Sequence, residues 1–166
     1  GEPGVTASVD GDRAALRCGD WAALREAAVP VRTEVFIVEQ AIPAELEWDE
    51  GDAVSIHCVA FAGDRAVGCG RLLPDGRIGR MAVLKPWRGQ GLGGAILERL
   101  VAAAKARGDA VARLSAQCHA EGFYRVHGFL PDGPVFDDAG IPHLPMKRAL
   151  RCIGRVRRIG ALPRAG

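Results

Sequence analysis

Apolar residues follow two different periods along the chain, and each period predicts its own kind of element. Three runs rich in apolar and β-branched residues cover 54–62, 66–73 and 78–84. The turn sequences Gly63-Asp64 and Pro74-Asp75-Gly76 separate them. Runs of this kind bounded by tight turns are typical of strands joined as hairpins. These residues therefore predict an antiparallel meander of three strands.

A helical period follows the meander. Apolar residues recur three or four positions apart over 92–104, and Gly108 stands where a helix C-cap is expected. The next apolar run, 111–116, predicts another strand, and 120–127 predicts a short helix. The last two strands are expected at Phe129 and around 143–150.

The residues before the meander predict one strand and two helices. A short strand is expected at 14–18. Asp20 is a suitable N-cap for a helix over 21–28, and Pro30 is expected to start a second helix over 31–40. The acidic segment that follows predicts a loop. The whole pattern indicates a mixed α/β fold.

The composition is that of an ordinary globular domain. The chain has 166 residues, of which 48% are hydrophobic and 25% charged, which excludes a mainly disordered protein. No run approaches the ~18 apolar residues of a membrane span, and residues 1–13 lack the pattern of a secretion signal. Five scattered cysteines without a CxxC pair predict reduced thiols in a cytoplasmic protein, and we expect no metal.

Charge is distributed unevenly along the chain. Residues 146–166 contain seven Lys or Arg and no acid, which leaves 15 basic and 20 acidic side chains in the other 145 residues. We expect a single domain over 1–150 and a basic appendage over 151–166, interpreted as a solvated chain end. The alternative is binding to an acidic partner, to nucleic acid or to the acidic body. The appendage has no aromatic residue for base stacking, which disfavours nucleic acid.

The segment Arg88-Gly89-Gln90-Gly91-Leu92-Gly93-Gly94 lies between a predicted strand and the long helix. Four glycines at the start of a helix indicate that the backbone approaches a ligand closely, and the free N–H groups there favour phosphate. A dinucleotide fingerprint would need an acid about 20 residues further on, and Leu114-Ser115-Ala116-Gln117 contains none. A nucleoside-triphosphate loop would need GK[ST], which is absent.

Several segments, in order and spacing, resemble one known family. Arg88–Gly93 is similar to an R/Q-x-x-G-x-G/A pyrophosphate loop, Arg80-Met81-Ala82-Val83 to a strand that pairs with pantetheine, and Phe123–Phe129 to an FYxxxGF segment. These are motifs of the GNAT superfamily of acetyl-CoA-dependent N-acetyltransferases. The ElaA-like branch is the most similar, on the segments Val35–Gln40, Ser115–His119 and Gly140–His143.

The resemblance implies a GNAT fold: a central, mostly antiparallel mixed sheet with helices on both faces. It implies an acetyltransferase that moves acetyl from acetyl-CoA to a primary amine by direct attack. Members often pair, so a homodimer is an open expectation. The cofactor would contact Met81, Ala82, Val83, Arg88, Gly89, Gln90, Gly91, Leu92, Gly93, Gly94 and Gln117, the last standing where many members have an Asn.

The chemistry then requires a proton acceptor and an acid. An aliphatic ammonium has a pKa near ~10.4, so forming the neutral amine at pH 7 costs about 4 kcal/mol. The resemblance implies that Tyr124, the only tyrosine, protonates the departing thiolate. Glu39 is our first choice of base because it follows the apolar turn 35–38. Glu45 is another candidate base, and Glu47, Asp49, His57 and His119 are candidates both for the base and for substrate-side contacts.

Seven acids within 34–52, with no Lys or Arg between Thr33 and Asp64, predict an anionic mouth that attracts a cationic amine. His143 is interpreted as structural. The acceptor is a small-molecule or peptide amine. A second function class, an acyl-CoA-binding regulatory module without turnover, would keep the same glycine loop.

Overall fold

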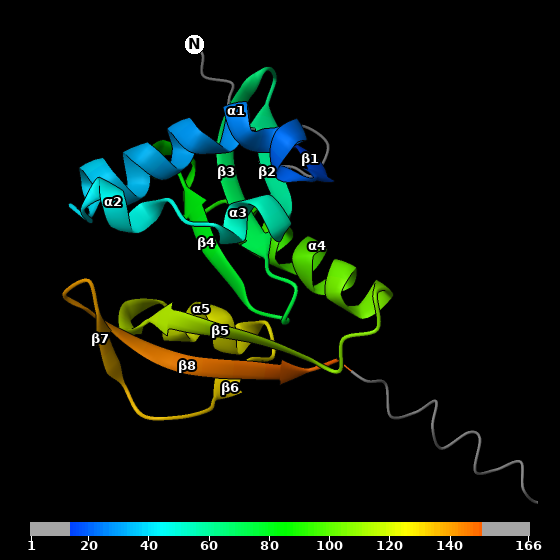
Figure 1. Ribbon diagram of the computed structural model, residues 1–166, viewed down its shortest axis with the longest axis vertical. Coiled ribbons are helices and arrows are strands. Elements are labelled where there is room, and N and C mark those ends of the chain that lie inside the picture. Colours follow the sequence, from blue (N-terminus) through cyan, green and yellow to red (C-terminus); the bar gives the residue numbers. More distant parts are fainter. Residues whose placement is uncertain (1–13, 151–166) are drawn as a thin grey trace, which may run out of the picture.

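The computed structural model describes residues 14–150, whose strands form two four-stranded sheets (Figure 1). The first sheet is antiparallel, in the order β1 (Ala14–Gly19), β2 (Ile56–Ala62), β3 (Arg65–Leu72), β4 (Ile78–Val83). The second has the order β5 (Val111–Gln117), β8 (Ile141–Ala149), β6 (Leu130–Pro131), with β7 (Phe136–Asp138) also pairing with β8. The predicted meander is confirmed, and β1 extends it.

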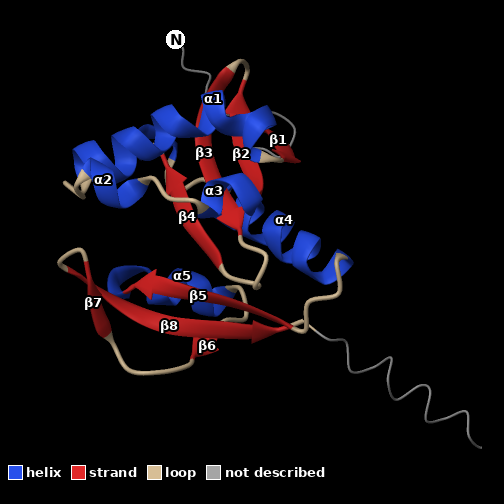
Figure 2. Ribbon diagram, in the orientation of Figure 1, coloured by secondary structure: helices blue, strands red, loops and turns tan. Residues whose placement is uncertain are grey.

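The helices complete a mixed α/β fold (Figure 2). They are α1 (Trp21–Arg32), the π-helix η2 (Thr33–Glu39), α2 (Ala44–Glu47), α3 (Gly51–Val54), η3 (Lys85–Trp87), α4 (Leu92–Ala106), η4 (Cys118–Ala120) and α5 (Glu121–Val126). No helix within 14–150 is long and apolar enough to cross a membrane. The basic appendage expected at 151–166 lies outside the described residues.

Helix α1 begins as predicted and ends later than predicted. The Asp20 carboxylate accepts a hydrogen bond from the Ala23 N–H at 2.9 Å and caps the helix. The prediction that Pro30 starts a second helix is wrong, because Pro30 lies inside α1 and η2 follows at Thr33 without a break. Proline removes one backbone hydrogen bond, but the buried Leu24 and Val31 hold the helix against the sheet and offset that loss.

Helices α1 and α4 cover opposite faces of the first sheet. On β3, Gly68 and Gly70 face α4, where a Cβ atom added to Gly70 would lie 2.9 Å from Leu100 Cδ1. Arg71, one position along, points to the other face and reaches a carboxylate that also binds Arg32 of α1. Helices therefore lie on both faces of the sheet, as expected.

The two sheets touch at one end and diverge at the other (Figure 1). Between β4 and β5 the described residues form a single parallel bridge, Arg77 with Arg113, where the Arg113 N–H donates to the Gly76 carbonyl at 3.0 Å. A bulge interrupts β4 at Arg80, whose φ of 50° is unusual for a side-chain-bearing residue. The mixed sheet is thus split, and its opening lies beside the glycine loop that follows β4.

Candidate active site

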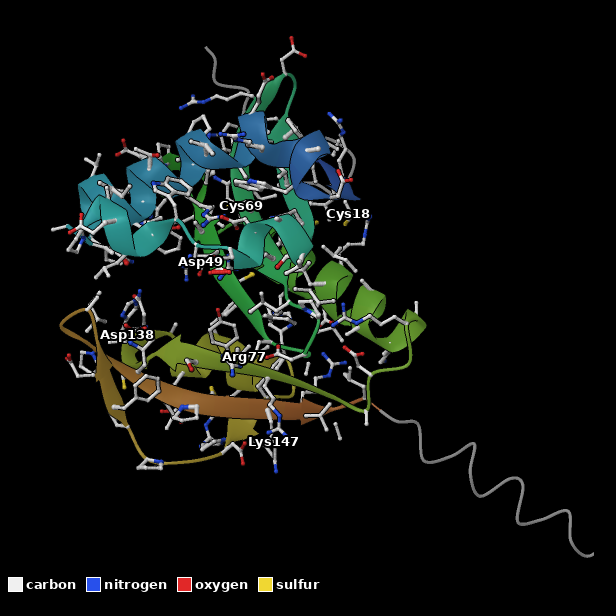
Figure 3. All side chains as sticks on the ribbon, viewed as in Figure 1. Cys18, Asp49, Cys69, Arg77, Asp138 and Lys147 are labelled. Atoms are coloured by element: carbon white, nitrogen blue, oxygen red, sulfur yellow. The ribbon has the colours of Figure 1, made fainter. Side chains whose placement is uncertain are left out.

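A cleft of about 1050 Å³ occupies the space between the diverging β4 and β5. Its first wall comes from η2, the segment around α2 and α3, and β4, and its second from β5, α5 and the turn between β7 and β8. Figure 3 shows Asp49 and Asp138 on opposite sides of the opening. Of the residues singled out from the sequence, those that line the cleft are Glu39, Glu47, Asp49, Met81, Ala82, Val83, Arg88, Gln117, His119, Tyr124 and His143.

The glycine loop leads into the N-terminus of α4. Gly89 and Gly91 have φ values of 77° and 87°, which favour glycine, and a Cβ atom added to either would meet nothing within 4 Å. Gly91 is the N-cap of the 15-residue helix, so the N–H groups of the first turn point towards this open surface. Their geometry suits a diphosphate.

Gly94 has a different role from Gly89 and Gly91. A Cβ atom here would lie 2.9 Å from His127 Nε2, so glycine permits α4 to pack against α5. Only part of the glycine run therefore serves the predicted phosphate site, and part serves helix packing.

Arg88 is held by two contacts beside this loop. Its Nε donates to the Val83 carbonyl at 2.8 Å, and its Nη1 and Nη2 atoms donate to the two Glu39 oxygens at 2.8 and 2.7 Å. The hydrogen bond from Arg88 lowers the pKa of Glu39. A carboxylate with a lowered pKa is a weaker proton acceptor, which opposes the role of base that the sequence suggested for Glu39.

Tyr124 reaches the cleft from α5. The side chain is 9% exposed, and its ring lies edge-on to Phe123 and Phe129, with centroids 4.9 and 6.1 Å away. Burial raises the pKa of Tyr124 to about 12. Its hydroxyl forms no hydrogen bond with residues 14–150, so the O–H is available to a bound molecule.

A buried ionic network lies under the first wall. Arg32 donates from Nε to Glu47 Oε2 at 2.8 Å and from Nη1 to Asp52 Oδ1 at 2.7 Å, and all three side chains are almost fully buried. The Trp48 ring lies 4.7 Å from the Arg32 guanidinium carbon. Burial raises the pKa of Glu47 despite these cations.

Two further arginines join the network to the cleft. Arg71 contacts Asp49 at 2.8 Å and Asp52 at 2.9 Å, and Arg80 contacts Glu47 at 3.2 Å and Asp49 at 3.3 Å. The hydrogen bond from Arg71 lowers the pKa of Asp49 to about 2. Arginines from α1, β3 and β4 therefore pair with Glu47, Asp49 and Asp52, and Arg88 pairs with Glu39, which opposes the predicted anionic mouth at four of its seven acids.

The structure separates the candidate histidines. His57 is buried between α1 and the first sheet, with its ring 4.7 Å from that of Trp21 and its Nε2 donating to the Asp52 carbonyl at 2.9 Å. Burial lowers the pKa of His57, and the residue does not line the cleft. His119 is exposed on η4 and lines the cleft.

Gln117 ends β5 and connects the two walls. Its side-chain amide exchanges two hydrogen bonds with that of Gln40, at 3.0 and 3.3 Å. Sequence reasoning did not select Gln40 or Arg71 as part of the site. A charged residue inside the apolar run of β3 was the available signal for Arg71, whereas nothing local marks Gln40.

No group of three or more His, Cys, Asp or Glu within residues 14–150 is placed to hold a metal ion. A cofactor without metal ligands, bound through backbone N–H groups and Arg88, fits the residues present.

The comparisons with known proteins identify the family of the chain. A family model described as "Acetyltransferase (GNAT) domain" matches residues 22–150. The uncharacterized N-acetyltransferase YjcF of Bacillus subtilis is 43% identical over 122 residues, which are 71% of this chain and 87% of that protein.

Solved structures show the same fold. A Pseudomonas aeruginosa acyl-CoA N-acyltransferase superposes with a TM-score of 0.72 at 33% identity, covering 81% of this chain and 99% of the other. ElaA of Escherichia coli superposes with a TM-score of 0.74 at 26% identity, with the same coverage of 81% and 99%.

Proposed function

The chain belongs to the GNAT acetyltransferases, and from this premise we propose that it transfers acetyl from acetyl-CoA to a primary amine by direct attack. The family makes it an acyltransferase that uses an acyl-CoA. The observation that carries the finer proposal is one cleft lined both by Arg88, the residue that begins the glycine loop, and by Tyr124.

The diphosphate would lie on the N–H groups from Gly89 to Gly94, with Arg88 at its side. Beyond the bridge at Arg77, the described part of the chain offers β4 no partner on its cleft edge. The Val83 carbonyl accepts from Arg88 Nε, so the pantetheine amides would pair with the other backbone groups of Met81–Val83 on that edge, much as a peptide adds to a sheet. Gln117 would face the arm from β5.

The bulge in β4 would serve the thioester. Arg80 and Met81 fall between the residues of β4 that pair in register with β3, so the bulge would turn a backbone N–H of this segment towards the cleft. A free N–H beside the thioester stabilises the charge that develops on its carbonyl oxygen when the amine attacks.

Tyr124 would donate its O–H to the departing sulfur. The raised pKa of about 12 keeps the phenol protonated at neutral pH. A thiol has a pKa near ~8.5, so complete proton transfer from this phenol is uphill by roughly 5 kcal/mol. A hydrogen bond that strengthens as negative charge reaches the sulfur is therefore the contribution that Tyr124 makes to the transition state.

The test combines binding and turnover. Coenzyme A is titrated calorimetrically, and acetyl transfer is measured with spermidine, glucosamine, a lysine peptide and a peptide with a free N-terminus. We expect Tyr124→Phe to lower kcat by about 10²-fold or more with unchanged coenzyme A affinity. Unchanged kcat would remove Tyr124 from the mechanism. Tight coenzyme A binding without turnover of any amine would contradict the proposed reaction and favour a binding module.

A further inference from the structure

The proposed function requires a group that takes the proton from the amine. We propose that His143 is this general base and acts through its Nε2 atom, an inference that rests on the proposed function. The sequence alone had pointed to a structural role for His143. Three observations support a catalytic role instead: His143 lines the cleft, its Nδ1 is hydrogen-bonded to a backbone carbonyl, and the nearby carboxylates are paired with arginines.

His143 lies at the end of the β5–β8 pair that is remote from the bridge between Arg77 and Arg113. It is the third residue of β8 and pairs in register with Gln117, the last residue of β5. Opposite residues of an antiparallel pair project to the same face, so His143 and Gln117 stand side by side on the cleft. Both line it, together with Ser115 on the same face of β5.

One hydrogen bond determines which ring nitrogen can accept a proton. His143 Nδ1 lies 2.8 Å from the Ile141 carbonyl oxygen. A carbonyl oxygen only accepts, so Nδ1 carries the hydrogen and, in the neutral ring, Nε2 carries the lone pair. Nε2 has no hydrogen-bond partner among residues 14–150. The ring also stacks on Phe136, with centroids 5.8 Å apart at 28°, which limits its rotation.

The carboxylates of the first wall are already committed to arginines. Glu39 binds Arg88, whereas Asp49 and Glu47 belong to the network of Arg32, Arg71 and Arg80. A proton taken up by any of them would leave a guanidinium without its partner, at a cost that is largest where the pair is buried. These acids therefore hold the wall together and are poor acceptors.

Two other groups on the cleft remain as competitors. Asp138 of β7 and His119 of η4 line it and are exposed. Asp137, also on β7, accepts from the Gly140 N–H at 3.2 Å and shapes the turn before β8. These are the titratable groups that β7 and η4 bring towards His143, while the end of β5 presents the uncharged Gln117 and Ser115. Asp138 has no ring nitrogen, and the His119 ring has no hydrogen bond to a backbone carbonyl within residues 14–150 that would fix its orientation.

The proton and electron balance is complete with the groups named. The ammonium gives one proton to Nε2, which passes it to solvent. The neutral amine attacks the thioester carbonyl, the N–C bond forms, and the C–S bond breaks with its electron pair going to sulfur. As the amide forms, the nitrogen loses its second proton. The thiolate sulfur gains one proton in turn and leaves as the thiol, with Tyr124 hydrogen-bonded to it.

The decisive variant is His143→Asn, because the Asn amide still donates to the Ile141 carbonyl but has no atom equivalent to Nε2. With the amine that the wild type acetylates fastest, we expect kcat/KM at pH 7 to fall by 10²–10⁴-fold. Coenzyme A affinity stays unchanged. The difference in kcat/KM between the wild type and this variant should shrink as pH approaches ~10, where much of the amine is already neutral. His119→Asn and Asp138→Asn should keep the acid limb of the wild-type pH profile.

Wild-type kcat/KM with an unchanged pH profile in His143→Asn would overturn the assignment, as would loss of the acid limb in either competitor variant. If His143→Asn fails to bind coenzyme A, ¹⁵N-histidine NMR on the wild type decides. His143 must show the Nδ1–H tautomer and titrate at the midpoint of the acid limb, and a mismatch refutes its role. Absence of turnover in the wild type is the separate result that refutes the proposed function.

Discussion

The carboxylates and thiols of this protein differ in reactivity because their neighbours differ. Glu39 and Asp49 are both held by arginines that lower their pKa values, whereas burial dominates at Glu47 and raises its pKa. The residue type therefore determines which proton transfers are possible, and the hydrogen-bonded neighbour within about 3 Å determines the pKa at which they occur.

The same reasoning applies to Cys18, which is exposed on β1 opposite Cys58 of β2. A hydrogen bond from Cys58 and the nearby Arg99, 3.8 Å from the sulfur, lower the pKa of Cys18 to about 6. The hydrogen bond to Cys18, burial and the Cys18 charge raise the pKa of Cys58, and burial raises that of Cys69 to about 12. These opposite shifts favour the thiolate at Cys18 over a thiolate at Cys58 or Cys69.

We expect iodoacetamide to modify Cys18 before the two buried thiols, with a rate that rises with pH and reaches half its maximum near pH 6. Arg99→Ala should shift this midpoint upwards, because it removes the cation beside the thiolate. Peptide mass spectrometry after timed quenching measures both, with Cys18→Ser as the control for other sites. A midpoint near ~8.5, the ordinary value for a thiol, would contradict this account.

At the scale of elements, α4 shows how one helix serves both packing and ligand binding. Its apolar side contains Ile96, Leu97 and Leu100, all fully buried against the first sheet. Its two ends are marked by left-handed glycines, Gly91 with φ 87° and Gly108 with φ 95°, each with open space where a Cβ would stand. The two positions have similar strain, but only Gly91 belongs to the loop that begins at Arg88, a residue that lines the cleft.

This symmetry provides a matched pair of variants. Gly91→Ala and Gly108→Ala should each lower the free energy of unfolding by about 1–2 kcal/mol, the cost of a left-handed backbone at an L-residue. Only Gly91→Ala should weaken coenzyme A binding, by tenfold or more, because its methyl group occupies the surface proposed for the diphosphate. Urea unfolding and calorimetry measure the two effects. Equal coenzyme A affinity in both variants would place the ligand elsewhere.

At the scale of the molecule, the ionic network joins α1, the α2–α3 segment and two strands of the first sheet into the wall of the cleft. Asp52 is central, since its carboxylate binds both Arg32 and Arg71 and is almost fully buried. The network stabilises the wall only while every charge is paired.

Asp52→Asn should therefore lower the free energy of unfolding by about 3–5 kcal/mol, because it leaves two buried guanidinium groups short of a carboxylate. Asp75→Asn is the matched control: its partner Arg77 is 3.6 Å away and both side chains are mostly exposed, so we expect a loss below about 1 kcal/mol. Urea unfolding of both variants gives the comparison. A loss below ~1 kcal/mol for Asp52→Asn would show that the network does not stabilise the fold.

The elements were largely predictable because their signals are local. The meander follows from apolar runs and turns only a few residues long. Asp20 caps α1 by accepting from the N–H of Ala23, only three residues further on. The glycine loop is equally local. The error at Pro30 arose where distant packing outweighs a local signal, since the burial of α1 against the sheet overrides the cost of the proline.

The sequence by itself determined the order and type of most elements, the glycine loop before α4 and the motif that contains Tyr124, because contacts over a few residues encode them. Only the tertiary structure decided that arginines pair with four of the seven acids of 34–52, since Arg32 and Glu47 are 15 residues apart and Arg88 and Glu39 are 49 apart. It also decided where the sheet splits and which histidines line the cleft. Such pairings depend on how whole elements approach one another in space, and no period of the sequence records that approach.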